Sequence, residues 1–275
     1  MTEEKIRKNV REGYAKVARQ QGSCCGPASS CCGSGDTTDT IAQKVGYSEE
    51  DLAAVPEGSN LGLGCGNPVA MASLKQGETV LDLGSGPGFD CFLAARRVGE
   101  TGRVIGVDMT SEMLARGREN ARKGEYRNVE FRLGEIEHLP VEDNSVDVIL
   151  SNCVINLSTD KAQVFREAFR VLKPGGRLMI SDTVIIKPLP EFLQQSMAAY
   201  VGCVSGAMRR HEYIETVKAA GFKEVQIVKE TPFSLDCIMN DPMAQAFAAE
   251  ANATGVTLKE IEGSLASIQI TGIKR

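Results

Sequence analysis

The order of hydrophobic and polar positions predicts alternating strands and helices from residue 79 onward. Short apolar runs predict strands near 79–83, 103–108, 128–133, 146–151 and 176–183. The segments between them have helical spacing near 88–98, 111–123 and 160–172. Strands that alternate with helices pair in parallel through right-handed crossovers. The pattern therefore predicts an α/β fold with a doubly wound, mostly parallel sheet and helices on both faces.

The two ends of the chain are patterned differently from this core. Residues 2–20 have the apolar stripe of a packing helix, and further helices are expected near 189–201 and 211–220. A strand is expected near 223–230, whereas 231–275 is weakly patterned and could form a small cap over the site. No linker separates independent domains. We expect an N-terminal helical segment over 1–70, a core over 71–188 and a C-terminal α+β extension over 189–275.

The first strand of the core runs directly into three glycines at alternate positions, Gly84, Gly86 and Gly88. Glycine there allows positive φ and lets a ligand lie against the main chain. The spacing differs from the G-x-G-x-x-G of dinucleotide-binding folds, but Asp82 precedes the glycines and Asp108 ends the second strand, where an acid suits a ribose diol. The alternative is that these glycines form only a structural turn between the strand and the helix. The full order favours a nucleoside pocket, because the strand is followed in register by the glycines, a helix, a second strand and an acid.

Composition excludes several classes of protein. The chain has 275 residues, a formal net charge of −5 and no cluster of lysine or arginine, so nucleic acid is not expected as a partner. No apolar stretch approaches the length of a membrane span, and the first residues lack the apolar core of a signal peptide. We therefore expect a cytoplasmic protein that does not bind membranes.

Nine cysteines set this chain apart, and with only two histidines a mixed Cys/His zinc site is nearly ruled out. In a reducing compartment they point to soft-ion binding, redox work or burial rather than to a static disulfide framework. Cys153 follows the fourth strand, at the edge where open α/β sheets bind ligands. Cys65 lies in a turn of glycines and prolines, where we expect it to face a cavity. Cys91 and Cys237 are expected to pack.

The segment 80–88 resembles the first motif of class I S-adenosylmethionine-dependent methyltransferases, which have a Rossmann-like sheet. The resemblance continues through 134–140, 145–150 and 171–178, in the order of that family's motifs. It implies S-adenosylmethionine as the cofactor and a set of residues around it. These residues are Asp82, Gly84, Gly86, Gly88, Asp108, Met109, Ile136, Glu137 and Asn152, with Glu135 as a further candidate beside the adenine.

Three segments that each contain a cysteine restrict the range of possible substrates. Trivalent arsenic is thiophilic, and three thiolates would hold it in a pyramid whose lone pair points at the methyl group. The segments 64–68, 151–157 and 202–207 resemble those of the arsenite methyltransferases. This resemblance implies that Cys65, Cys153 and Cys203 bind As(III), and that an N-terminal cysteine, Cys32 or its neighbour Cys31, enters a disulfide during turnover.

The N-terminal cysteines form two adjacent pairs rather than one cysteine, so which thiol is the redox thiol stays open. Cys24, Cys25, Cys31 and Cys32 could equally make an accessory metalloid or zinc site.

The leading hypothesis is methyl transfer to thiolate-bound arsenite, or to its thiol conjugates, giving mono- and dimethylated products. A disulfide cycle, served by a thioredoxin- or glutathione-type reductant, would restore As(III). A small-molecule carbon or oxygen methyltransferase of the quinone-biosynthesis type is one alternative, and a non-catalytic metalloid-binding protein is another.

Overall fold

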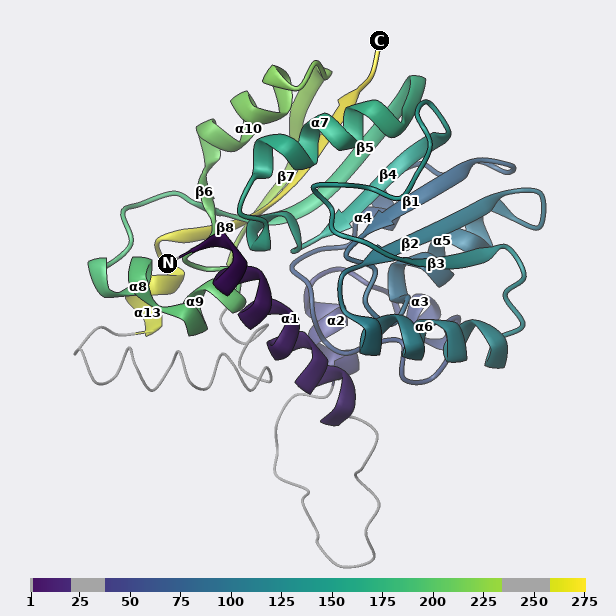
Figure 1. Ribbon diagram of the computed structural model, residues 1–275, viewed down its shortest axis with the longest axis horizontal. Helices are drawn as coiled ribbons and strands as arrows, with labels where there is room; N and C mark the ends of the chain where they lie inside the picture. The colour runs from purple at the N-terminus through teal and green to yellow at the C-terminus, as the bar shows by residue number, and fades with distance from the viewer. Residues whose placement is uncertain (1, 21–37, 234–257) are drawn as a thin grey trace, which may run out of the picture.

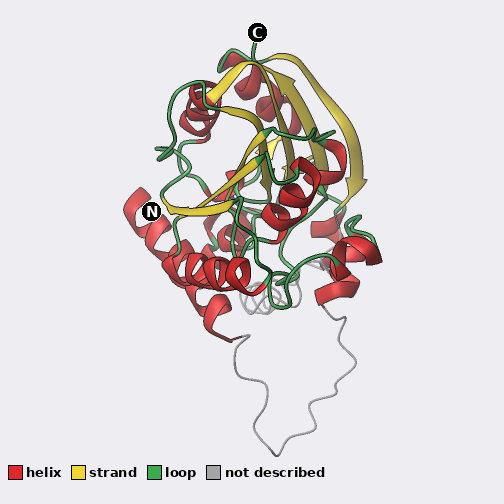
Figure 2. Cartoon of the chain, turned by 90° about the vertical axis from the view of Figure 1, so that its right-hand side faces the viewer, coloured by secondary structure: helices red, strands yellow, loops and turns green. Residues whose placement is uncertain are grey.

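A twisted central sheet forms the framework of the chain, and helices cover both of its faces (Figures 1 and 2). The structure is a computed structural model that describes residues 2–20, 38–233 and 258–275. Its strands are β1 Thr79–Leu83, β2 Arg103–Asp108, β3 Val129–Leu133, β4 Val146–Asn152, β5 Leu172–Ile185, β6 Met208–Arg209, β7 Lys223–Pro232 and β8 Leu265–Ile273. They pair in the order β3-β2-β1-β4-β5-β8-β7, and β6 pairs with β5 outside this path.

The helices fill the connections between these strands and extend the chain at both ends. They are α1 Glu3–Gln20, α2 Thr38–Lys44, α3 Glu49–Ala53, α4 Pro68–Met71, α5 Phe89–Val98, α6 Ser111–Lys123, the 3₁₀ turn η1 Ile155–Leu157, α7 Lys161–Val171, α8 Glu191–Gln195, α9 Met197–Val201, α10 Arg210–Ala219 and α13 Leu258–Glu262. No helix within the described ranges has both the length and the apolar character needed to cross a membrane.

The parallel part of the sheet follows the expected doubly wound order. β1 pairs with β2 on one side and with β4 on the other, both in parallel. The order of strands therefore reverses at β1, and the carboxyl ends of β1 and β4 open a crevice there. The predicted fold class is confirmed, and the switch point lies where the sequence placed it.

Each face of the sheet has its own hydrophobic cluster. Successive residues of a strand point to opposite faces. Val80 accordingly packs with Phe92 of α5 and Leu114 of α6. Leu81 packs on the other face, in the cluster that contains Phe165 of α7 and Tyr213 of α10. This alternation fixes the register of β1, and with it the position of the glycines that follow.

Two features of the C-terminal region differ from the sequence expectation. The weakly patterned tail supplies β8, which lies antiparallel between β5 and β7. The sequence does alternate there, with polar Ser267, Gln269 and Thr271 on either side of Ile268 and Ile270, so a strand pattern was present and was missed. Residues 265–270 are nevertheless all buried, the polar ones included. The helix expected over 189–201 is divided into α8 and α9 at Ser196, whose extended backbone caps α9 through its hydroxyl. The division of the chain into three regions stays a prediction.

We predict that Ile270→Ala destabilises the fold by about 2–5 kcal/mol, because it empties a fully buried position in the centre of the sheet. The free energy of unfolding in urea measures the loss. Thr271→Ala, a half-buried neighbour on the same strand, is the matched control and should cost well under half as much. Equal losses at the two positions would contradict the central place of β8.

Candidate active site

A pocket opens at the carboxyl ends of β1 and β4, and its empty space, with open solvent at its mouth included, is about 1130 Å³. Eight of the nine predicted cofactor residues line it: Asp82, Gly84, Gly86, Asp108, Met109, Ile136, Glu137 and Asn152. Cys153 lines the same pocket. Its position, at the switch point of an open α/β sheet, is that of a site for a nucleotide-like ligand.

The glycines after β1 have separate tasks. A Cβ at Gly84 would come within 2.4 Å of the Val154 side chain, whereas a Cβ at Gly86 would meet nothing within 4 Å. Gly86 therefore leaves its backbone open toward the pocket. Gly88 does not line the pocket: it caps α5 at φ 98°, and a Cβ there would collide with Phe131. Its role in the structure is packing of the helix against the sheet.

Asp108 ties the glycine turn to the end of β2. Its Oδ2 accepts the Gly86 N–H at 2.9 Å and its Oδ1 accepts the Thr110 N–H at 2.8 Å. Burial raises the pKa of this carboxyl, and the two backbone donors oppose the rise. Each oxygen keeps a lone pair for a further donor, which suits the two hydroxyls of a ribose.

The adenine end of the pocket has an apolar side at Met109 and Ile136 and a polar side at Glu137. Glu137 is buried, and its Oε1 accepts the Ser158 hydroxyl at 2.6 Å. Arg7 of α1 approaches the same carboxylate at 3.9 Å. Taken with the open glycine turn and Asp108, this lining fits S-adenosylmethionine, the cofactor that the resemblance implied.

Helix α1 contributes to this pocket, which the sequence reasoning missed. Arg7, Val10 and Tyr14 line the pocket from α1. The sequence shows only an apolar stripe there, and that stripe is equally typical of a helix that merely packs. Only the position of α1 over the sheet shows that this helix forms a wall of the pocket.

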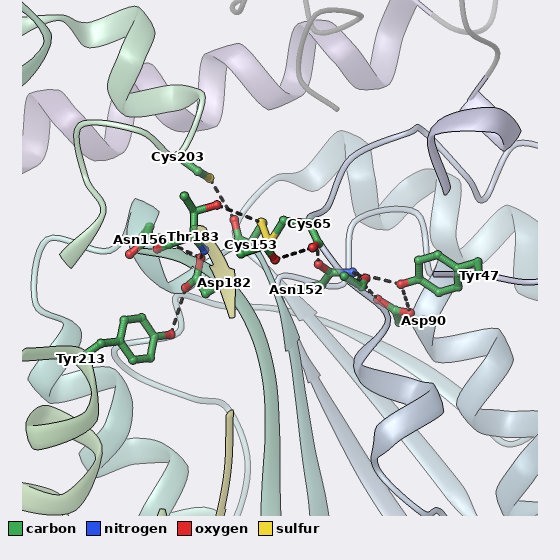
Figure 3. The surroundings of a disulfide bond; sticks show 12 residues. Tyr47, Cys65, Asp90, Asn152, Cys153, Asn156, Asp182, Thr183, Cys203 and Tyr213 are labelled. Atoms are coloured by element: carbon green, nitrogen blue, oxygen red, sulfur yellow. Dashed lines mark hydrogen bonds between the residues drawn. A yellow bond between two sulfur atoms is a disulfide. The ribbon is translucent and has the colours of Figure 1, made fainter. Parts of the chain in front are cut away.

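The three candidate arsenic ligands meet at one place, although they lie far apart in the sequence (Figure 3). Cys65 and Cys153 form a disulfide with a Cα–Cα distance of 6.0 Å. The Cys203 thiol donates to the Cys153 carbonyl oxygen at 3.0 Å. The expectation was three thiolates, so the structure differs in joining two of them. Their close backbone spacing is within the range that a disulfide requires.

Cys153 and Cys203 share an unusual backbone conformation. Their φ angles are 54° and 60°, in the left-handed region that residues other than glycine rarely adopt. Such a residue costs about 1–3 kcal/mol, and strain of this kind clusters at functional sites. Nothing in the residue pattern indicates this conformation, since both positions carry an ordinary L-residue after a regular element.

Asn152 fixes the position of the Cys65 turn against the end of β4 (Figure 3). Its Oδ1 accepts the Cys65 N–H at 3.1 Å, and its Nδ2 donates to the Gly66 carbonyl oxygen at 2.8 Å. The same Nδ2 lies 3.0 Å from the Tyr47 hydroxyl and 3.2 Å from Asp90 Oδ2. Burial raises the pKa of Asp90 to about 6. Tyr47 and Asp90 had not been assigned to the site.

Asp182 lies on the other side of the sulfur atoms and was also missed (Figure 3). One of its oxygens lies within 4.8 Å of the Cys65 and Cys153 sulfurs. The carboxylate accepts hydrogen bonds from Asn156 at 2.8 Å and from the Tyr213 hydroxyl at 3.0 Å. Burial raises its pKa to about 7. An acidic residue inside an apolar strand was the only signal in the sequence.

The remaining cysteines do not enlarge this site within the described residues. Cys91 is fully buried, and its thiol donates to Asp82 Oδ2 at 3.2 Å. It packs, as expected. The predicted redox and accessory positions Cys24, Cys25, Cys31 and Cys32, together with Cys237, lie outside the described residues.

A comparison with models of protein families identifies the class of protein to which this chain belongs. Residues 74–229 match the family model described as a methyltransferase domain, which covers more than half of the chain. The chain belongs to this methyltransferase family.

The resemblance to arsenite methyltransferases is confirmed by several relatives. The chain is 50% identical over 231 residues to the arsenite methyltransferase of Halobacterium salinarum. The aligned region covers 82% of this chain and 59% of the relative. The chain is 43% identical to the arsenite methyltransferase of Aquipseudomonas alcaligenes, over 66% of this chain and 54% of the relative. The chain thus spans little more than half the length of these relatives.

One solved structure supports the same assignment. It is that of an arsenic(III) S-adenosylmethionine methyltransferase from Chlamydomonas reinhardtii, with 31% identity and a TM-score of 0.63. The alignment covers 85% of this chain and 73% of that one. Shared sequence and shared fold therefore extend well beyond the glycine turn.

We predict that Asp182→Asn flattens the pH dependence of stability. The pKa of Asp182 in the folded state, about 7, lies above the ordinary value of 3.8. The folded state therefore holds the proton more tightly, and its stability falls as the pH rises from about 4 to about 7. Between pH 5 and pH 8 the variant should lose about 2–3 kcal/mol less than the wild type, in urea unfolding with the disulfide intact.

Asp143→Asn, at a carboxylate that is 67% exposed, is the control for this measurement. It should leave the wild-type pH dependence in place. If Asp182→Asn behaves like this control, burial does not hold the Asp182 proton in the folded state.

Proposed function

We propose that this protein transfers methyl groups from S-adenosylmethionine to trivalent arsenic held by Cys65, Cys153 and Cys203. The observation that carries the proposal is the convergence of these cysteines beside the pocket at the end of β4. A carbon or oxygen methyltransferase with the same core has no need for them. The names of the relatives support the same substrate.

Methyl transfer to arsenic requires the protein mainly to hold the two reactants in position. S-adenosylmethionine supplies a methyl group on a positively charged sulfur. Three thiols that replace the hydroxyls of arsenite release water and leave arsenic with a lone pair on the open side. Because that lone pair carries no proton, methyl transfer needs no general base. The cysteines hold the nucleophile, and Asn152 sets the Cys65 turn at the correct distance.

The disulfide supports a redox part in the same cycle. If arsenic leaves a methylation step in the pentavalent state, two electrons must return it to the trivalent state. Two thiols supply these electrons when they join as a disulfide and release two protons. A thioredoxin- or glutathione-type reductant then restores the thiols. Cys32 or Cys31 stays our prediction for a further redox thiol, and an accessory metalloid or zinc site made by Cys24, Cys25, Cys31 and Cys32 stays the alternative.

We predict that the reduced protein, given arsenite, S-adenosylmethionine and a dithiol, yields methylated arsenic in chromatographic speciation. Cys153→Ser should reduce the yield by at least about 100-fold, because a hydroxyl is a poor ligand for a soft centre. The affinity for S-adenosylmethionine should change little. Cys91→Ser, at a cysteine outside this set, keeps a donor for Asp82 Oδ2 and is the matched control; it should keep most of the activity.

The result separates the candidate functions. Arsenite binding without methylated product would point to a metalloid-binding protein. A folded wild-type protein that neither binds nor methylates arsenite would leave the quinone-type methyltransferase as the better hypothesis.

We predict that Asp108→Asn weakens S-adenosylmethionine binding by about 10-fold or more, which corresponds to the loss of a charged hydrogen bond of about 1.5–3 kcal/mol. Isothermal titration calorimetry measures the dissociation constant, and circular dichroism checks the fold. Asp143→Asn again serves as the exposed control. Unchanged affinity in the Asp108 variant would exclude this carboxylate from cofactor binding.

A further inference from the structure

A second cavity lies behind the turn that carries Cys65 and encloses about 620 Å³. The end of α2, the turn itself, the last residues of β7 and the middle of β8 form its walls. The lining residues are Lys44, Val45, Cys65, Gly66, Lys229, Thr231, Pro232, Phe233, Ser267 and Gln269.

The disulfide spans the wall between this cavity and the cofactor pocket. Gly64 and Cys153 line the cofactor pocket, whereas Cys65 and Gly66 line the second cavity. The two linings have no residue in common. Cys65 is 8% exposed and lines the second cavity, whereas it does not line the cofactor pocket.

Polar groups at the back of the cavity indicate a built site. Gln269 is only 5% exposed, and its Oε1 has no hydrogen-bond partner among the described residues. A buried acceptor without a partner is costly, and a bound donor would satisfy it. Next to it, the Ser267 hydroxyl donates to the Cys65 carbonyl oxygen at 2.6 Å and fixes the backbone of that cysteine.

The two charged side chains among the described lining residues of the cavity are both lysines. Lys44 and Lys229 are both exposed and line it from α2 and β7. No aspartate or glutamate is among its described lining residues. A cavity lined by cations raises the local concentration of anionic ligands.

We propose that this cavity binds a small thiol that carries carboxylate groups, of the glutathione class, and that the thiol reduces the disulfide by attack on Cys65 while S-adenosylmethionine stays bound. This inference rests on the proposed function for its place in a catalytic cycle. The two lysines take the carboxylates, and an amide N–H of the ligand meets Gln269 Oε1.

The exchange balances in two steps. The thiolate of the ligand attacks the Cys65 sulfur, the bond to Cys153 breaks, and Cys153 leaves as a thiolate that takes up a proton. The thiolate of a second ligand molecule then attacks the sulfur of the first ligand molecule in the mixed disulfide. This releases the Cys65 thiol and the oxidised, disulfide form of the ligand. Two electrons thus pass from the two ligand thiols to the disulfide of the protein. The thiol released first is that of Cys153, which lines the cofactor pocket.

The access from two sides is tested by disulfide exchange without arsenic. Reduced Cys153→Ser and Cys65→Ser proteins are treated with oxidised glutathione, and peptide mass spectrometry follows the mixed disulfide at the cysteine that remains of this pair. Saturating S-adenosylmethionine should slow the reaction of Cys153 by about 10-fold or more and that of Cys65 by less than about twofold. Equal slowing of both would overturn the proposal.

The charge preference is tested in the Cys153→Ser background with Lys44→Gln and Lys229→Gln combined. The loss of both cations should slow the reaction of Cys65 with oxidised glutathione by about 10-fold, and with the uncharged 2-hydroxyethyl disulfide by less than about twofold. Lys123→Gln, on the distant helix α6, is the matched control and should change neither rate. Equal effects on the charged and uncharged reagents would overturn the role of the lysines.

A third arm separates a free thiol from a thiol conjugate of arsenite. The Lys44→Gln/Lys229→Gln protein with both cysteines methylates arsenite supplied as its glutathione conjugate, with tris(hydroxypropyl)phosphine, an uncharged reductant that is not a dithiol, so that the arsenic stays on glutathione. The rate should stay within about twofold of wild type, since an uncharged reductant needs no cation. A tenfold loss would assign the cavity to the conjugate and overturn its role in reduction.

The proposed function and this inference fail separately. Because the exchange assays contain no arsenic, a protein that shows two-sided access without methylating arsenite would contradict only the proposed function. A protein that methylates arsenite but reacts at Cys65 only when S-adenosylmethionine is absent would contradict only the second cavity.

Discussion

The hydrogen bonds of one amide side chain, Asn152, join the two halves of the site. Asn152 ends β4, and its amide holds both the N–H of Cys65 and the carbonyl oxygen of Gly66. A Cβ at Gly64 would come within 2.9 Å of this amide, so the close approach depends on glycine. These contacts, together with the hydrogen bond from the Ser267 hydroxyl to the Cys65 carbonyl oxygen, set the position of the turn that carries Cys65 relative to Cys153, and the disulfide depends on that position.

Two buried carboxyl groups flank this arrangement and differ from ordinary surface acids. Asp90 and Tyr47 lie beyond Asn152, and Asp182 and Tyr213 lie beyond the sulfur atoms (Figure 3). Burial raises the pKa of both carboxyls, to about 6 and about 7. Their hydrogen bonds offset part of the cost of removing polar groups from water. The cysteines are thus held in a rigid polar shell rather than on free loops, which suits a reaction that depends on position.

The methyltransferase core was largely predictable, because its pattern is local. The strands β1, β2 and β4 are short apolar runs and β3 alternates, and the glycine turn, Asp108 and the acid-rich segment around Glu137 lie at fixed distances along the chain. The strand β8 alternates as well, through Ser267, Ile268, Gln269 and Ile270, but its polar side chains are buried, and its pairing between β5 and β7 could not be read from the pattern. Asp182 was missed for a related reason: it lies between Ser181 and Thr183, and the burial of these three polar residues is not visible in the sequence.

The sequence by itself determined the strands and helices of the core and the place of the nucleoside pocket, which follow from spacing along one chain and from residue chemistry. Its resemblance to the arsenite methyltransferases pointed to the three cysteines. Only the tertiary structure decided that Cys65 and Cys153 form a bond, that Cys153 and Cys203 adopt left-handed backbones, and that the two cysteines of the disulfide line different cavities. Those facts depend on contacts between segments some 50 to 200 positions apart, such as Cys203 with Cys153 and Ser267 with Cys65, which no local pattern records.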